Sequence, residues 1–385
     1  MTQPVLFSFF SGSGFLDLGF ERNGFRVDFV NEYHRPFLDA YRFSREVMGL
    51  EGPRHGYSDL DINEYVYGSS SRKMQEMVSD SRQSGGLIGF IGGPPCPDFS
   101  VGGKNRGRDG ENGRLTETYV DAIIKFKPDF FIFENVKGLW RTKRHREFYE
   151  QMKKTLSAAG YSFIDRLTNS IEYGVGQDRD RVILFGVSQS LFAAGDTISA
   201  EKLNWGSYLK YDAKRIIKSV EWPDYDTYSE NTVSTAPEAI SPFLDVTVQY
   251  WFDRNDVCNH ANAEHHFVPR AALSKFQEIR EGDVSRKSFK RLHRWRYSPT
   301  AAYGNNEVHI HPYKSRRISA AEALAIQSLP VEFELPPSMS LTNMFKTIGN
   351  GVPYLFAAGV ATMVYDYLEL VNTGESTLKQ LEAAV

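Results

Sequence analysis

The stretch that decides the fold reads Val5-Leu6-Phe7-Ser8-Phe9-Phe10-Ser11-Gly12-Ser13-Gly14, and helically spaced apolar residues follow it over 15–22. The apolar run is typical of a buried strand, and the Ser-Gly-Ser-Gly sequence breaks it before the helical spacing begins. The sequence therefore predicts a strand, a tight turn and a helix at the start of the chain.

Four further apolar runs have the length of buried strands. They cover 27–30, 87–91, 130–133 and 182–187, and helical patterns such as 117–125 and 146–158 lie between them. Strands that alternate with helices predict an α/β fold, a doubly wound and mostly parallel sheet. Polar or special residues follow the runs, at the strand ends where open parallel sheets bind ligands.

The strand–helix rhythm ends at Val187 and divides the chain into three predicted parts. Residues 1–187 form the sheet domain, 188–305 form a smaller domain of short aromatic-rich pieces, and 306–385 return to the first domain. Helical spacing resumes over 319–328 and 354–367. Ser319 with Glu322 three residues later predicts a capping box at the start of the first of these helices.

Composition excludes several classes of protein. The 385 residues carry a net charge of -3, so any nucleic-acid contact must come from local basic patches. No apolar run predicts a membrane span, and the two cysteines suit a reducing compartment better than a disulfide-stapled secreted fold. We expect a folded enzyme without a membrane partner.

The glycine turn and an acidic residue indicate a nucleoside site. Gly12 and Gly14 allow a ligand close to the backbone, and Glu32, after the second strand, can accept hydrogen bonds from ribose hydroxyls. Phe15 follows Gly14, so the three-glycine pattern that cradles a pyrophosphate is absent. A purely structural turn is the alternative.

Cys96 stands in the sequence Gly92-Gly93-Pro94-Pro95-Cys96, directly after a predicted strand. A nucleophilic cysteine needs an exposed thiolate whose pKa is lowered by nearby positive charge, and the following residues 102–108 supply cations. The pattern favours a nucleophile. An inert cysteine next to a turn is the alternative.

Glu134 and a pair of arginines follow or begin other strands. Glu134 emerges from the apolar run 130–133, where desolvation would raise its pKa and let it share a proton. Gln177, Arg179 and Arg181 alternate, so they share one face of a strand, and two arginines on one face call for an anionic partner. A capping role for Glu134 and a surface ladder of ion pairs are the alternatives.

These motifs together resemble the DNA cytosine-5 methyltransferases of prokaryotic restriction-modification systems. In the family's order they are the turn 10–14, Asn31-Glu32, Pro94-Pro95-Cys96, Glu134-Asn135-Val136, Gln177-x-Arg179-x-Arg181, Arg317 with Glu322, and Gly349-Asn350-Gly351-Val352-Pro353. The resemblance implies the sheet of S-adenosylmethionine-dependent methyltransferases with a target-recognition domain over 188–305, and S-adenosyl-L-methionine as the cofactor.

The resemblance also implies a cofactor site. Phe10 would stack on the adenine, Glu32 would hold the ribose with Tyr33 alongside, and Asp59 would bind the adenine amine, with Asp61 as a competitor. The remaining implied contacts are Ser11, Gly12, Gly14, Leu60, Pro95, Leu115, Asn350 and Val352.

The implied reaction methylates the 5-carbon of a cytosine flipped out of duplex DNA. Cys96 would attack the 6-carbon, Glu134 would contact the ring nitrogen, and Arg179 and Arg181 would position the nucleotide and Cys96, with Gln177 in support. Two positions depart from the family pattern: Pro97 replaces the usual Gln after the cysteine, and Phe15 replaces a glycine.

Nucleic-acid contacts are expected in two places. Ser100, Lys104 and Arg106 follow Cys96. A second basic segment with interleaved aromatics, over 286–297, contributes Arg291, Arg294 and Arg296, although a solvated basic face is the alternative.

Cys258, His260, His265 and His266 match no zinc spacing, so we expect no metal and interpret these residues as ordinary loop or core positions.

Other functions remain open from the sequence. A transfer-RNA cytosine-5 methyltransferase would use the same scaffold, a nicotinamide-dependent oxidoreductase would share the first strand and turn, and a non-catalytic DNA-binding module would need neither Cys96 nor Glu134. The family setting implies duplex DNA and a separately acting restriction endonuclease as partners. It also implies a monomer in the bacterial cytoplasm, associated with the nucleoid.

Overall fold

A seven-stranded sheet forms the centre of the computed structural model, which describes residues 2–95, 111–192, 197–199, 203–269, 273–286, 288–301, 303 and 307–373. The strand order is β3-β2-β1-β4-β5-β8-β6. The strands are β1 (Val5–Phe9), β2 (Arg26–Asn31), β3 (Tyr57–Ser58), β4 (Ile88–Gly92), β5 (Phe130–Val136), β6 (Tyr161–Asn169) and β8 (Asp180–Ser188). β3, β2, β1, β4 and β5 are mutually parallel, whereas β8 is antiparallel to both β5 and β6. The predicted doubly wound, mostly parallel sheet is confirmed.

Helices cover both faces of this sheet because the side chains of its strands alternate. Phe130 and Ile132 belong to the core that α2 and α14 help to close, whereas Phe131 and Phe133 belong to the core beneath α4, α5 and α7. The helices of this lobe are α1 (Phe15–Glu21), α2 (Arg35–Val47), α3 (Ile62–Val66), α4 (Ser71–Gln83), α5 (Glu111–Phe126), α6 (Lys137–Arg141), α7 (Lys143–Ala158) and α14 (Tyr354–Thr373), with short 3-10 turns at η2 (Ser170–Tyr173), η3 (Gln189–Leu191) and η4 (Trp205–Tyr208).

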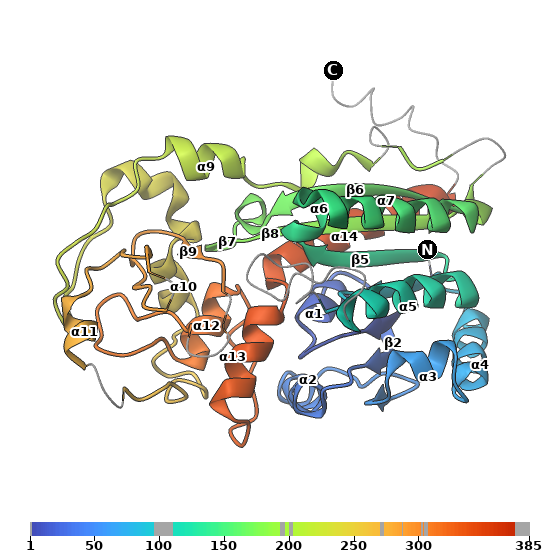
Figure 1. Cartoon of the computed structure of the whole chain (residues 1–385), viewed down its shortest axis with the longest axis horizontal. Helices are drawn as coiled ribbons and strands as arrows, with labels where there is room; N and C mark the ends of the chain where they lie inside the picture. Colours follow the sequence, from blue (N-terminus) through green and yellow to red (C-terminus); the bar gives the residue numbers. More distant parts are fainter. Residues whose placement is uncertain are drawn as a thin grey trace.

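A smaller lobe lies to the left of the sheet in Figure 1 and consists mostly of irregular chain. Its elements are α9 (Ala213–Ser219), η5 (Glu238–Val246), α10 (Val248–Arg254), α11 (Leu273–Glu278), α12 (Ala320–Ile326) and the two-stranded parallel pair β7 (Gln177–Asp178) and β9 (Ser298–Pro299). α12 begins with the predicted capping box of Ser319 and Glu322.

The two lobes share a hydrophobic cluster. It contains Phe15 and Leu18 of α1, Trp251 of α10, Leu324 of α12 and Met344 of α13 (Leu341–Asn350). The segment after residue 305 therefore packs against both lobes before α14 reaches the sheet. The division of the chain at residues 187 and 305 stays a prediction.

α14 follows α13 closely, and together they are long and apolar enough over Leu341–Asn372 to cross a membrane by composition alone. In the structure Phe356, Val360, Val364 and Leu368 are fully buried in the core of the sheet. Their apolar character is explained by this packing, because α14 contacts α1 and closes one face of the sheet.

Candidate active site

The glycine turn between β1 and α1 has the backbone that its sequence predicts. Phe10, Gly12 and Gly14 have φ angles of 53°, 57° and 78°, the left-handed region that glycine tolerates best. Glu32 holds this turn: its Oε2 accepts from the Gly12 amide at 2.8 Å and its Oε1 from the His34 amide at 2.7 Å. Burial raises the pKa of Glu32, although both amides oppose the rise. We call residues 10–14 the cofactor turn, after the cofactor site that the sequence resemblance implies there.

Three of the expected cofactor contacts, Ser11, Tyr33 and Leu60, differ in their exposure and partners. The Ser11 hydroxyl is buried and has no hydrogen-bond partner in the part of the chain that the structure describes. Tyr33, next to Glu32, is 72% exposed, and Leu60 is 43% exposed, so both side chains are accessible. A buried polar atom without a partner calls for an explanation, and a ligand contact is one.

Asp59 and Asp61 differ in what they already bind. Asp61 is the N-cap of α3 and accepts from the Asn63 amide at 2.8 Å. Among the described residues, the half-exposed Asp59 carboxylate has one ion-pair contact, a long one of 3.9 Å with Arg35. The geometry therefore favours Asp59 as the acceptor that remains for a ligand.

The segment after α13 returns to the same place. Thr347 Oγ1 lies 2.7 Å from Ser13 Oγ, and a Cβ on Gly351 would lie 2.2 Å from the Phe15 ring. The side chain of Asn350 is exposed, whereas Val352 is buried. The structure thus brings residues 350–352 to the cofactor turn as expected. Phe10 and Leu115 pack against the same hydrophobic core of the sheet.

Glu134 lies at the end of β5, paired with Arg181 across the antiparallel β5–β8 ladder. Arg181 Nε is 2.8 Å from Glu134 Oε1, and each side chain is 11% exposed. Burial raises the pKa of Glu134, and the charges of Arg181 and Arg179 oppose this rise. The sequence predicted an anionic partner for the two arginines, and Glu134 is that partner for Arg181.

Gly93, three residues before Cys96, lies against the Glu134 carboxylate. A Cβ at Gly93 would lie 2.6 Å from Glu134 Oε2. Gly93 was not predicted as a site residue, because a glycine before a Pro-Pro pair is equally typical of a simple turn. Cys96, Ser100, Lys104 and Arg106 lie outside the described residues.

Arg179 has a different environment from the one expected. It is 1% exposed and donates to the carbonyl oxygens of Ala301 (3.1 Å), Gly349 (2.9 Å) and Gly351 (2.9 Å). Its two terminal nitrogens bond to backbone carbonyls rather than to an anion, which corrects that expectation, whereas its buried Nε has no hydrogen-bond partner among the described residues. Its position ties the chain before residue 352 to the end of the sheet.

Gln177 lies in the same buried network. Its Oε1 accepts from the Ala301 amide at 3.1 Å, and its Nε2 donates to Gln327 Oε1 at 3.3 Å. Gln327 in turn donates to the carbonyl of Ile348 at 2.6 Å. No sequence signal pointed to Gln327, because the contact joins residues 150 positions apart.

Glu322 pairs with Arg316 and His311, and not with Arg317, the residue that accompanies it in the family motif. Arg316 Nη2 lies 2.7 Å from Glu322 Oε1, and His311 Nε2 lies 3.3 Å from the same oxygen. Arg317 instead donates to the backbone carbonyl of Val308. The motif organises the smaller lobe, but through the neighbouring arginine.

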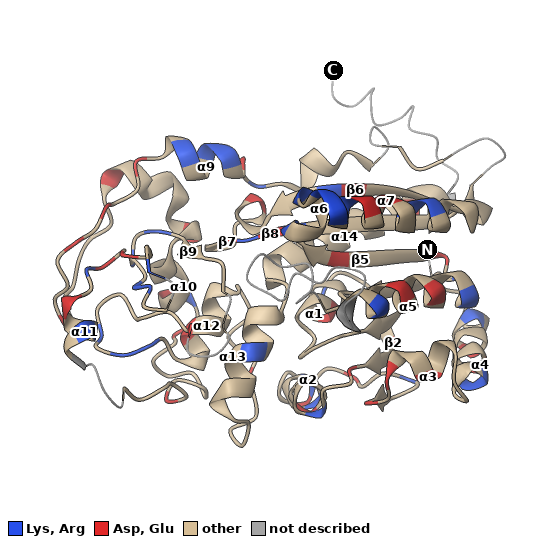
Figure 2. Cartoon of the chain, viewed as in Figure 1, with Lys and Arg blue, Asp and Glu red and all other residues tan. Residues whose placement is uncertain are grey.

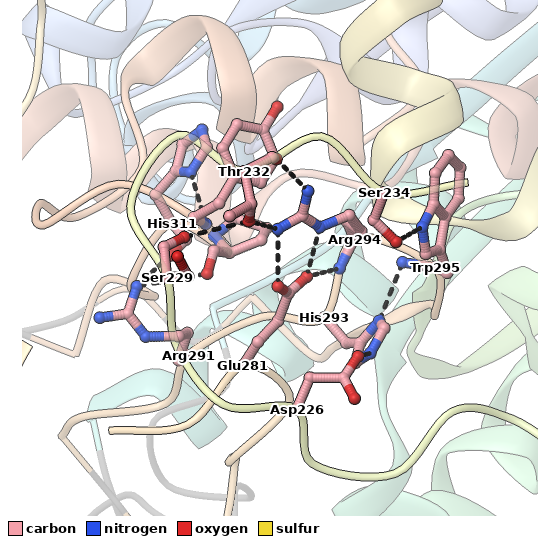
Figure 3. A network of polar contacts seen from close by, with 12 residues as sticks. Asp226, Ser229, Thr232, Ser234, Glu281, Arg291, His293, Arg294, Trp295 and His311 are labelled. Carbon is pink, nitrogen blue, oxygen red and sulfur yellow. Dashed lines mark hydrogen bonds and ion pairs between the residues drawn. The ribbon is translucent and has the colours of Figure 1, made fainter. Parts of the chain in front are cut away.

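The predicted nucleic-acid contacts of Arg291 and Arg294 are wrong for this structure, because both side chains are buried. Arg291 donates to the carbonyls of Ile279 at 2.8 Å and His311 at 2.6 Å. Arg294 forms a bidentate pair with Glu281, at 2.8 Å for each bond, and reaches the carbonyl of Thr232 (Figure 3). Both guanidinium groups bond to residues inside the smaller lobe, where they stabilise segments without regular secondary structure.

Arg296 differs from these two residues. It is half-buried and lies over the ring of Tyr297 at 5.3 Å. Exposed basic side chains of the lobe also occur on α9, which is blue in Figure 2: Lys214, Arg215 and Lys218. Residue type could not separate these solvent-facing cations from the buried ones, because an arginine carries the same charge in either place.

The cysteine and histidines near residue 260 have structural surroundings. Cys258 is exposed, and His260 Nδ1 accepts from the Asn262 amide at 3.0 Å while its Nε2 lies 3.2 Å from the carbonyl of Phe333. Within the described ranges, no group of histidine, cysteine and carboxylate side chains is arranged to hold a metal ion.

Known proteins resemble this chain over most of its length. The family model described as C-5 cytosine-specific DNA methylase matches residues 5–365. Type II methyltransferase M.NmeDI of Neisseria meningitidis serogroup C is 56% identical over 368 residues, which cover 95% of this chain and 84% of that protein. Type II methyltransferase M.FnuDI of Fusobacterium nucleatum is 28% identical over 94% of each chain.

Solved structures share the fold. A prophage-encoded protein of E. coli described as a DNA modification methyltransferase superposes with a TM-score of 0.64 at 20% identity, covering 95% of this chain and 99% of that one. S. pombe Dnmt2 methyltransferase gives a TM-score of 0.58 at 12% identity, over 96% and 99%. The chain belongs to the C-5 cytosine-specific DNA methylase family and is a DNA (cytosine-5-)-methyltransferase.

Proposed function

We propose that this enzyme transfers a methyl group from S-adenosyl-L-methionine to the 5-carbon of one cytosine, flipped out of duplex DNA, through a covalent bond to Cys96. The observation that carries the proposal is the buried Glu134–Arg181 pair, whose carboxylate lies against Gly93. Cys96 follows three residues later. An acid and a thiol at neighbouring strand ends are the two groups that addition to a cytosine ring requires.

The chemistry divides between these residues. The Cys96 thiolate forms a bond to the 6-carbon, and the electron pair of the double bond moves toward the ring nitrogen that Glu134 contacts. A proton shared from Glu134 stabilises this electron-rich ring. The 5-carbon then takes the methyl group. A base removes the hydrogen of the 5-carbon, and the bond to Cys96 breaks as the ring double bond reforms.

The residues around the cofactor turn fit the methyl donor. When bound, S-adenosylmethionine supplies a methyl group activated on a sulfonium. Phe10 and Tyr33 would contact the adenine and Glu32 the ribose. The other contacts would come from Ser11, Gly12, Gly14, Asp59, Leu60, Pro95, Leu115, Asn350 and Val352. The unpartnered Ser11 hydroxyl and the largely free Asp59 carboxylate support this assignment.

We assign positioning roles to the other polar residues of the site. Arg181 orients Glu134, whereas Arg179 and Gln177 hold the backbone of 301 and 349–351 against the sheet. Substrate contact by Arg181 is compatible with its partial exposure.

The proposed substrate is duplex DNA, with transfer RNA as the alternative. Arg296 and the exposed cations of α9 are candidates for phosphate contacts. Ser100, Lys104 and Arg106 stay candidates from the sequence. We further propose a monomer that acts in the bacterial cytoplasm, at the nucleoid, beside a separate restriction endonuclease.

The test is covalent trapping. Fully duplex DNA synthesised with 5-fluorocytosine and incubated with S-adenosylmethionine should form an adduct with the wild type, because fluorine cannot leave as a cation. Cys258→Ser, which changes the only other cysteine, should still form it, whereas Cys96→Ser should not. An adduct at another residue would overturn the mechanism. Methyl transfer to transfer RNA alone would replace the substrate.

A further inference from the structure

Five polar side chains gather behind the cofactor turn, and the reaction described above uses none of them. They are Ser8, Asp17, Glu21, Tyr41 and Arg45, which we call the Arg45 cluster. All except Glu21 are 1% exposed, and the Glu21 side chain is 13% exposed. Burying two carboxyl groups and a guanidinium is costly, so their mutual contacts must compensate and a role beyond packing is indicated.

Arg45 is the centre of the cluster. Its Nη2 donates to the carbonyl oxygen of Gly14 at 2.7 Å and lies 2.7 Å from Glu21 Oε2. Its guanidinium also lies over the Tyr41 ring, 4.2 Å from the centroid. On the other side, Ser8 Oγ donates to Asp17 Oδ1 at 2.9 Å.

Helical spacing explains how three elements supply these groups. Asp17 and Glu21 are four residues apart on α1, and Tyr41 and Arg45 are four residues apart on α2, so each pair shares one helix face. The two faces meet beneath Gly14, where an added Cβ would lie 2.4 Å from Tyr41 and 2.8 Å from Arg45. The last glycine of the cofactor turn is therefore required by the cluster behind it.

We propose that Arg45 is a positioning residue for the methyl donor, because its bond to the Gly14 carbonyl fixes the conformation of the cofactor turn. The inference rests on the proposed function. Glu32 holds the same turn through the Gly12 amide. The turn is thus held at two successive glycines, and Asp17 adds negative charge that favours the Arg45 guanidinium.

Asp17 makes this arrangement sensitive to pH. Burial raises the pKa of Asp17 to about 6, Arg45 opposes the rise, and Glu21 adds to it. The groups that face it are Ser8 of β1, Glu21 of α1, Tyr41 and Arg45 of α2, and Tyr119 of α5. As the pH falls through about 6, Asp17 becomes neutral and Arg45 keeps Glu21 as its carboxylate partner. Cofactor affinity should fall over the same range.

Binding of S-adenosylmethionine to the full chain without DNA, measured by calorimetry, tests the proposal. At pH 7.5 Arg45→Met should raise the Kd about tenfold, as expected for a lost charge-assisted hydrogen bond, and Arg45→Lys should restore part of the affinity. Asp17→Asn should show at pH 7.5 the Kd that the wild type shows at pH 5. It should also lose the fall in affinity that is centred near pH 6. The KM for DNA should change less than twofold in all three variants.

Arg291→Lys is the matched control, because Arg291 is an equally buried arginine that donates to carbonyls in the other lobe. It should leave the Kd unchanged. If circular dichroism shows that Arg45→Met does not fold, Arg45→Lys and Asp17→Asn test the proposal in its place. A folded Arg45 variant with wild-type Kd, or an Asp17→Asn profile with the wild-type pH dependence, overturns the inference. A wild type that does not bind S-adenosylmethionine overturns the proposed function instead.

Discussion

At the scale of single residues, we predict that Glu134 determines the pH dependence of the reaction. Burial raises its pKa above the ordinary value, so it keeps its proton to higher pH than an exposed glutamate. If the protonated form assists the ring nitrogen, kcat falls as the pH rises through the pKa of Glu134. Glu134→Gln should lower kcat about a hundredfold and remove this alkaline fall.

A change at Arg181 tests the role of Glu134 in the pH dependence independently. The charge of Arg181 opposes the rise in the pKa of Glu134, so Arg181→Met should move the alkaline fall in kcat to higher pH. The measurement is a kcat profile at saturating DNA and methyl donor. An unchanged alkaline limb in Glu134→Gln would show that another group titrates.

At Gly93, even the addition of one methyl group should lower activity. A methyl group there would lie 2.6 Å from Glu134 Oε2, so the carboxylate must move. Since a displacement of about 1 Å can cost about a hundredfold, Gly93→Ala should lower kcat by that order while cofactor affinity stays within twofold. Gly206→Ala is the control, because nothing lies within 4 Å of its added methyl group. Equal kcat in the two variants would remove Gly93 from the site.

At the scale of elements, the sequence predicted what local pattern determines. Each of the five apolar runs is a strand, and the capping box of Ser319 and Glu322 is present. β6 was missed because it is an edge strand in which Asp165 and Arg166 interrupt the apolar residues, so it contains no apolar run. β3 has two residues, too few to form a pattern.

The site shows the same division between local and long-range information. Glu32 and Glu134 were predicted because each follows a strand, and both lie at the ends of strands in the sheet. The buried roles of Arg179 and Arg294 could not be predicted, because charge alone does not tell whether a guanidinium meets a phosphate or a carbonyl. Arg179 reaches Gly349, 170 positions away. Such contacts depend on the assembled fold.

At the scale of the whole molecule, the two lobes have different kinds of support. The large lobe is built on a continuous sheet, whereas the small lobe has little regular structure and relies on pairs such as Glu281–Arg294, each 5% exposed in its side chain. Burial raises the pKa of Glu281, but the bonds from Arg294 outweigh it and lower the pKa. This carboxylate is therefore charged and depends on its arginine.

Breaking that pair should separate the functions of the lobes. Arg294→Met leaves Glu281 charged and buried without its partner, a loss of about 3–5 kcal/mol in the stability of the small lobe. We expect rapid proteolysis within 221–313 and a large rise in the KM for DNA, while calorimetry still shows wild-type binding of the methyl donor. Glu281→Met combined with Arg294→Met should recover much of the protease resistance, because no uncompensated charge remains. If the single variant loses methyl-donor binding as well, the lobes unfold as one unit, and the cluster that joins α1 to α10 and α12 must couple their stability.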